Sequence, residues 1–335
     1  MKIADLDLEK EILIIAEIGN NHEGNFDLAK KMISLAAQAG ANAVKFQVIV
    51  PEKLVSGESI ERLEQLKKFQ LSYQEFEKLS SVAKDENVLF LATPFDIESV
   101  NFLNNLVPAF KISSADNNFF PLIETVAHTA KPILLSAGLA DIEGLLKTKN
   151  FIQAIWKRLK IAQDMAILHC VTSYPVKPTE ANLLAILTLQ RRFSMVAGYS
   201  DHTQGIDAAV LSVALGARII EKHFTIRKNY SSFRDHKLSA DPEEFSLLVK
   251  KVKLAVSMLG DGLKRLQDSE KEVVSKLRRS VAAKHNLSKG KVLTQDDITW
   301  LRCPQGINLG QEKLLGKRLI RDIAKGYTIL IGDVN

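Results

Sequence analysis

ILIIAEIG (residues 12–19) and AVKFQV (43–48) are short runs in which apolar and β-branched residues occupy consecutive positions. This pattern is typical of strands that are buried on both faces, as in parallel sheets. A helical pattern from Asp27 to about Gln38 separates the two runs. Six further runs, each followed by a helical pattern, are VLFLATPF (88–95), AFKISS (109–114), PILLSAG (132–138), AILHCV (166–171), MVAGYSD (195–201) and ARIIEKHF (217–224).

Eight strand-then-helix units over about 250 residues predict an α/β fold, a (β/α)8 TIM barrel. An open, doubly wound sheet of eight strands would show the same local pattern. Against the open sheet, no G-x-G-x-x-G motif follows the first run, and polar residues recur at the end of every run. In a barrel these ends meet on one rim, where the active site of such folds lies.

The pattern of alternating strands and helices ends after Gly262. The stretch KRLQDSEKEVVSKLRR (264–279) is charged, and beyond it LSKGKVLTQDDI (287–298) and IAKGYTILIGDV (323–334) each place a Lys-Gly turn before a short apolar run. We predict a barrel domain over residues 1–262, a linker or exposed helix over 263–276, and a small β-rich domain over 277–335. A domain of this size buries a limited core by itself, which favours packing against a neighbour.

The composition excludes several classes of protein. A formal net charge of +6, from 45 Lys and Arg interleaved with 39 Asp and Glu, does not suggest nucleic-acid binding but suits an anionic small molecule. Two cysteines, Cys170 and Cys303, are too few for a disulfide framework or a Cys-rich zinc site. No apolar run approaches the roughly 18 residues of a membrane span, and the acidic N-terminus lacks the basic start of a secretion signal. We expect a cytoplasmic protein that binds no membrane.

Two lysines, Lys45 and Lys111, stand inside otherwise apolar strands, where an unpaired ammonium costs several kcal/mol. A structural ion pair, a side chain that reaches the rim, or a Schiff-base lysine would each account for one of them. Two such lysines with several hydroxyl groups nearby favour a site for phosphate or a phospho-carboxylate. The hydroxyl residues are Thr93, Ser114, Ser136 and Ser200.

Further chemistry is predicted at the ends of the first and the last two strands. His202 and His223 end adjacent strands, so their imidazoles could share a Zn, Mn, Fe or Co ion completed by water and substrate. Each could also be an ordinary structural histidine. Glu17 lies in a buried strand and is either an ion-pair partner of one of the lysines or a general base with a raised pKa.

Eight motifs, in order along the chain, resemble the sialic acid synthase (N-acetylneuraminate synthase) family. They are AEIGNNHEGN (16–25), KFQ (45–47), ATPFD (92–96), KISSAD (111–116), LSAG (135–138), HCVTSYP (169–175), GYSDHT (198–203) and EKHFT (221–225). The C-terminal part resembles the antifreeze-like (SAF) domain of the same family. The resemblance implies a metal-dependent transferase that condenses phosphoenolpyruvate with an N-acylated mannosamine-type sugar.

The resemblance also implies a role for each matching residue. Glu17 matches the catalytic carboxylate, and His202 and His223 match the ligands of a divalent metal, Mn²⁺ first, with Mg²⁺ or Co²⁺ as alternatives. The phosphoenolpyruvate pocket is matched by Lys45, Thr93, Lys111, Ser114, Ser136, Thr172 and Ser200. The sugar contacts are matched by Gln47, Asp116, Tyr174, Asp235 and Arg302. Arg302, in WLRCP (300–304), matches an arginine that reaches over the barrel of the neighbouring subunit, which implies a head-to-tail, domain-swapped homodimer.

Two positions depart from the family pattern and leave the acceptor sugar open. Asp116 stands where related synthases often carry Glu, and Phe233-Arg234-Asp235-His236 stands where Gly-Pro-Asp is common. The product could be N-acetylneuraminate, its 9-phosphate, or legionaminic or pseudaminic acid. A Schiff-base aldolase and a non-catalytic glycan-binding protein are the alternatives from other classes.

Overall fold

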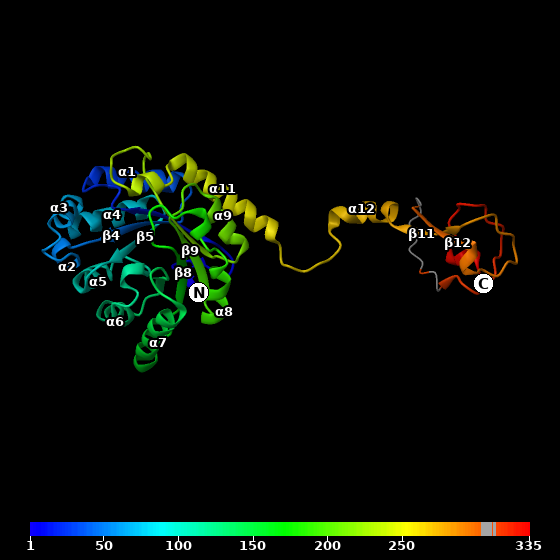
Figure 1. The fold of residues 1–335 in the computed structure, drawn as a ribbon, viewed down its shortest axis with the longest axis horizontal. Coiled ribbons are helices and arrows are strands. Elements are labelled where there is room, and N and C mark those ends of the chain that lie inside the picture. Colours follow the sequence, from blue (N-terminus) through cyan, green and yellow to red (C-terminus); the bar gives the residue numbers. More distant parts are fainter. Residues whose placement is uncertain (303–309, 311–312) are drawn as a thin grey trace. The chain divides into compact units, whose positions relative to one another are not determined.

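The structure is a computed structural model that describes residues 1–302, 310 and 313–335 (Figure 1). The chain divides into two compact units, Met1–Gly260 and Asp261–Asn335. Within the described ranges, no helix is both long enough and apolar enough to span a bilayer.

The first unit is a closed barrel of eight parallel strands, in the order β10-β3-β4-β5-β6-β7-β8-β9. The last strand closes the barrel because it pairs with β9 on one side and with β3 on the other, where Ile219 lies opposite Leu13. The predicted TIM barrel is therefore confirmed, and the open sheet is excluded. The strands are β3 (Leu13–Gly19), β4 (Ala43–Val48), β5 (Leu89–Pro94), β6 (Phe110–Ile112), β7 (Ile133–Ser136), β8 (Met165–Cys170), β9 (Val196–Asp201) and β10 (Ile219–His223).

Helices surround the strands on the outside of the barrel (Figure 1). Several begin at a side chain that accepts a hydrogen bond from the first turn, as Asn25 does from the amide of Leu28 and Asp96 from that of Ser99, which satisfies an otherwise unpaired amide. The helices are α1 (Phe26–Gln38), α2 (Pro51–Leu54), α3 (Ile60–Phe69), α4 (Tyr73–Asp85), α5 (Ile97–Leu103), α6 (Phe120–His128), α7 (Ile142–Leu159), α8 (Ala185–Phe193), α9 (Asp207–Ala214), α10 (Asp235–Leu238) and α11 (Pro242–Leu259).

Alternate residues of each strand belong to two different apolar layers. In β3, Ile14 and Ala16 pack with residues of the surrounding helices, whereas Leu13 and Ile15 belong to a separate cluster inside the barrel. This inner cluster also contains residues of the hairpin β1 (Lys2–Ile3) and β2 (Leu6–Asp7), which covers the end of the barrel where the strands begin. The inner face is apolar at that end, so the polar inward positions are left to the other end.

The second unit is small and β-rich, as predicted. It begins with α12 (Asp268–Leu277), followed by β11 (Arg279–Ala283) and β12 (Ile298–Arg302), which pair in antiparallel fashion. The two similar sequence fragments also meet, because Leu287 and Ile323 exchange backbone hydrogen bonds of 2.8 Å in both directions. The unit has an apolar core of its own, formed by Val281, Ala283, Leu287, Leu293, Ile298, Leu314, Leu319, Ile323, Ile329 and Val334.

Candidate active site

A polar cavity of about 300 Å³ lies at the carboxyl ends of the barrel strands. Its floor is made by the inward positions that follow the apolar inner layer: Glu17 comes two residues after Ile15, and Glu221 comes two residues after Ile219. Most of the residues predicted from the sequence line it together. They are Glu17, Lys45, Gln47, Thr93, Lys111, Ser114, Ser136, Thr172, Tyr174, Ser200, His202, His223 and Asp235.

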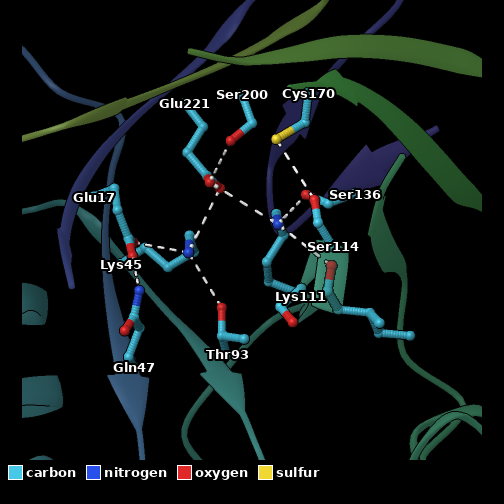
Figure 2. A network of polar contacts seen from close by, with 12 residues as sticks. Glu17, Lys45, Gln47, Thr93, Lys111, Ser114, Ser136, Cys170, Ser200 and Glu221 are labelled. Atoms are coloured by element: carbon cyan, nitrogen blue, oxygen red, sulfur yellow. Dashed lines mark hydrogen bonds and ion pairs between the residues drawn. The ribbon is translucent and has the colours of Figure 1, made fainter. Parts of the chain in front are cut away.

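Two buried lysines and two buried carboxylates form the centre of the cavity. The ammonium of Lys45 lies 2.8 Å from Glu17 and 3.7 Å from Glu221, and the ammonium of Lys111 lies 3.9 Å from Glu221. Figure 2 shows both ammonium groups pointing toward the carboxylate of Glu221 between them. Lys45 also donates to Thr93 (3.1 Å), and Lys111 donates to Ser136. The formal charges of the four groups balance.

The pKa values of these groups differ in direction because their partners differ. Burial raises the pKa of Glu221, but Lys111 and Lys45 outweigh it and hold the pKa below its usual value. Burial and the nearby Glu221 raise the pKa of Glu17, and Lys45 and the hydrogen bond from Gln47 lower it by less, so that pKa stays raised. Burial lowers the pKa of Lys111 more than Glu221 restores it. Lys111 is therefore the cation that gains most from a bound anion.

Hydroxyl groups lie beside the lysines and carboxylates of the cavity. Ser200 donates to Glu221 (2.9 Å), and Ser114 lies 3.5 Å from the thiol of Cys170. The hydroxyl of Thr172 is buried and has no hydrogen-bond partner among the described residues. A buried hydroxyl without a partner is costly, and a phosphate or carboxylate oxygen in the cavity would satisfy it.

Two imidazoles lie close together among the residues that line the cavity. The ring centroids of His202 and His223 are 5.4 Å apart. Nδ1 of His202 lies 2.9 Å from the carbonyl of Val171, which leaves Nε2 as its free nitrogen. Nδ1 of His223 has no partner within the described part of the chain, and burial lowers the pKa of this side chain well below its usual value.

This pair fits a divalent metal that is completed by other ligands. A neutral imidazole is the form that binds metals, and His223 is buried in that form. Among the described residues there is no group of three or more His, Cys, Asp or Glu side chains set to hold an ion. Protein atoms alone would therefore supply two ligands, with water and substrate oxygens supplying the others.

The mouth beside the imidazoles carries the predicted sugar contacts. The ring of Tyr174 lies 4.4 Å from that of His202, and the guanidinium of Arg234 lies 4.9 Å from the Tyr174 ring. Arg234 also donates to Asp235 (3.2 Å). Gln47 donates to Glu17 (3.0 Å), so in this structure the amide orients the carboxylate.

Two predicted residues are not among those that line this cavity. Asp116 is in the 3₁₀ helix Ser114–Asp116, and its carboxylate accepts a hydrogen bond from Ser113 instead of lining the cavity. Arg302 ends β12 in the second unit, opposite Arg279, and is exposed. The remainder of the WLRCP motif, Cys303 and Pro304, lies outside the described residues.

Several lining residues had no role assigned from the sequence, among them Glu221, Cys170 and Arg62. Glu221 lies near the ammonium groups of both lysines. The sequence feature that could have pointed to it is its position two residues before His223, on the same face of the strand. The Cys170 thiol lies 3.7 Å from Nδ1 of His202. Arg62, on α3, reaches the mouth from a long connection that has no periodic signal pointing to the site.

Comparison with known proteins places this fold and site in a family. Residues 32–264 match the NeuB family and residues 278–335 match the SAF domain. The chain is 43% identical over 326 residues to an uncharacterized protein of Methanocaldococcus jannaschii, covering 96% of this chain and 93% of that protein. It is 37% identical over 323 residues to the N,N'-diacetyllegionaminic acid synthase of Campylobacter jejuni, covering 92% and 96%.

The crystal structure of the N-acetylneuraminic acid synthetase from Leptospira borgpetersenii is similar with a TM-score of 0.74 and 37% identity, covering 78% of this chain and 90% of that one. The N-acetylneuraminate-9-phosphate synthase of Homo sapiens is 31% identical over 340 residues, covering 95% of this chain and 91% of that protein. The matches span the barrel, the site at its rim and the C-terminal unit. The chain therefore belongs to the NeuB family and carries a C-terminal SAF domain.

Proposed function

We propose that this protein condenses phosphoenolpyruvate with an N-acylated mannosamine-type sugar, releasing phosphate and giving a nine-carbon sialic acid or a relative such as legionaminic or pseudaminic acid. The observation that carries the proposal is one cavity in which an anion-binding end, Lys45 and Lys111, lies beside two buried imidazoles. The family supports the same reaction class, because its similar members include synthases of legionaminic, pseudaminic and sialic acids.

Phosphoenolpyruvate binds at the lysine end. Lys45 and Lys111 hold its phosphate and carboxylate, and the hydroxyls of Ser136, Thr172 and neighbouring residues donate to their oxygens. The free cavity holds two carboxylates against two ammonium groups. A bound anion competes with Glu221 for both ammonium groups, so each lysine then pairs with the substrate as well as with the carboxylate.

His202 and His223 would hold a divalent cation, most simply Mn²⁺ with Mg²⁺ or Co²⁺ as alternatives, which when bound supplies Lewis acidity at the open-chain aldehyde of the sugar. Tyr174 and Asp235 orient that sugar at the mouth. C3 of phosphoenolpyruvate then forms the new carbon–carbon bond to the aldehyde carbon, whose C=O π bond opens to an alkoxide, and C2 becomes oxocarbenium-like. The alkoxide becomes a hydroxyl by taking up the proton that the water adding at C2 gives up.

Glu17 completes the reaction. Its raised pKa and its hydrogen bond from Gln47 suit it to take a proton from the water that adds at C2. The tetrahedral intermediate expels phosphate with cleavage of the C–O bond. Lys45 and Lys111 offset the charge on the departing group.

The proposal is tested by phosphate release from phosphoenolpyruvate and Mn²⁺ across a panel of acceptors: N-acetylmannosamine, its 6-phosphate and the diacetamido trideoxy sugars. Release that depends on one acceptor identifies the substrate. Absence of release with every acceptor would favour a glycan-binding protein. A Schiff-base aldolase, which the lowered pKa of Lys111 would suit, would be trapped covalently by borohydride and would keep its activity in chelator.

Metal dependence gives a second test. We expect excess chelator to abolish phosphate release and Mn²⁺ to restore it, because His202 and His223 position the ion. His202→Ala or His223→Ala should each lower turnover by about 100-fold or more and weaken Mn²⁺ binding measured by calorimetry. Full activity in chelator would overturn this part of the proposal.

A further inference from the structure

The segment Ser231–His236 forms one wall of the cavity mouth, and one carboxylate binds both of its ends. Phe233, Arg234 and Asp235 from this segment line the cavity. At one end Ser231 donates to Glu23, and at the other Nε2 of His236 lies 2.8 Å from the same Glu23 oxygen. Glu23 comes from the loop between β3 and α1, so it ties the segment to a different strand of the barrel.

The hydrogen bonds of the His236 side chain are formed in the interior of the protein. Its side chain is fully buried, and its Nδ1 lies 2.7 Å from the hydroxyl of Thr225. Both ring nitrogens are therefore partnered, one by Thr225 and one by Glu23. Buried polar groups that are partnered in this way hold one conformation, and Asp235 is the residue directly before His236.

The backbone at Glu23 gives an independent observation. Its φ is +48°, in the left-handed region that non-glycine residues rarely occupy. Gly24, next to it, has a φ of +78°, and a Cβ there would lie 2.1 Å from the carbonyl oxygen of Lys68. Position 23 lies in the same turn, and a glycine there would adopt the backbone conformation without strain. Strain kept at the edge of a functional site points to a use for the side chain.

The segment also separates two cavities. A second cavity of about 490 Å³ adjoins the first and shares Arg62, Phe233 and Arg234 with it, and Glu23 and Ser231 are among its other lining residues. The ring of Phe233 packs edge-on against Phe69 of α3 at 5.0 Å. Displacement of the segment would therefore change the size and shape of the mouth.

We propose that Glu23 is a positioning residue for the acceptor sugar: by binding Ser231 and His236 together, it holds Asp235 and Arg234 at the mouth and so sets which acceptor fits. This inference rests on the proposed function. The hydrogen bonds of Glu23 go to Ser231 and His236 and not to Lys45 or Lys111, so we expect it to act on the sugar and to leave phosphoenolpyruvate binding alone.

The test compares two substitutions with a matched control. Glu23→Gly removes the carboxylate and relieves the backbone, so we expect an apparent KM for the sugar about tenfold higher and an unchanged KM for phosphoenolpyruvate. Glu23→Gln keeps an oxygen acceptor and should stay within about threefold of the original enzyme. The control, Lys160→Gly, relieves a similar left-handed residue (φ +56°) at the end of α7 and should leave both KM values unchanged.

Two further measurements separate this inference from the proposed function. Combining Glu23→Gly with Asp235→Asn should raise the KM for the sugar by less than the product of the two separate effects, because Glu23 acts in part through Asp235; fully multiplied effects would overturn the inference. Hydrogen exchange at residues 231–239 should become faster in Glu23→Gly but not in Lys160→Gly, and this readout needs no activity. If the original protein released no phosphate with any acceptor, the proposed function would fail while exchange still tested the role of Glu23. An unchanged sugar KM, equal rises in both KM values, or unchanged exchange would each contradict it.

Discussion

Individual charged residues at the barrel rim are buried in pairs of opposite sign. Lys45 is held between Glu17 and Glu221, so burial does not remove its charge: burial lowers its pKa, but the two carboxylates outweigh that effect and raise it. An isolated buried ammonium would instead lose its proton or destabilise the fold. The same pairs allow the site to bind an anion, because a substrate anion can replace a carboxylate as the partner of a lysine.

The exchange of Glu17 for its amide tests its role as base. Glu17→Gln preserves shape and removes only the proton acceptor, so we expect the variant to fold, to bind phosphoenolpyruvate at least as tightly, and to lose about 100-fold or more in turnover. Steady-state kinetics and a thermal melt measure these quantities. If the variant unfolds, Glu17 is instead a structural ion-pair partner of Lys45.

Gly138 makes room for the hydroxyls of Thr172 and Ser114. A Cβ at this position would lie 2.4 Å from the hydroxyl oxygen of Thr172 and 2.6 Å from that of Ser114, so Gly138→Ala must turn both hydroxyls away. We expect the KM for phosphoenolpyruvate to rise about tenfold or more, with a smaller change for the sugar. The control is Gly57→Ala, since a Cβ at Gly57 would have no atom within 4 Å. Equal kinetics for the two variants would show that the hydroxyls do not bind this substrate.

At the scale of elements, each barrel strand divides its inner face between stability and chemistry. The inward residues near the start of the strands join the hairpin β1–β2 in one apolar cluster, and those near the end form the polar cavity. This division is the usual one in barrels of this kind, where the two ends of the strands serve different purposes.

The hairpin end should therefore affect stability without affecting kinetics. Leu8 is fully buried in the inner cluster, and Leu8→Ala should lower the free energy of unfolding by about 2–5 kcal/mol while both KM values stay unchanged. Leu254→Ala on α11, where the side chain is 54% exposed, is the control and should cost less than about 0.5 kcal/mol. Chemical denaturation followed by circular dichroism measures both. A large change in KM for Leu8→Ala would show that the two ends are coupled.

At the scale of the whole molecule, the question is what role the second unit has in the reaction. It has its own small apolar core, yet Trp300 and Leu301 of β12 remain 37% and 39% exposed beside Arg302. We propose that the active unit is a homodimer in which Arg302 serves the barrel of the partner subunit. The cytoplasmic location expected from the sequence also remains a prediction.

Mixing two impaired variants tests this assembly. Arg302→Ala should mainly raise the KM for the sugar. In a heterodimer of Arg302→Ala with Glu17→Gln, one barrel would carry both defects and the other neither, so activity should return after subunit exchange. No recovery despite demonstrated exchange would mean that Arg302 acts in its own subunit or not on the substrate.

The sequence by itself determined the eight strands, their order and most of the polar side chains at their ends. These features are local: apolar runs mark buried strands, and a charged residue inside such a run, as at Lys45 or Lys111, stands out without any knowledge of its neighbours. The order of the family motifs along the chain identified most of the other residues that line the cavity.

Only the tertiary structure decided which groups are partners. Closure of the barrel pairs β10 with β3 and sets Glu221 between two lysines that come from β4 and β6, a contact that no local pattern encodes. The same holds for Glu23, whose partners Ser231 and His236 are more than 200 residues away in the sequence. Strand identity depends on neighbours along the chain, whereas charge pairing depends on the register between distant strands and on the loops that follow them.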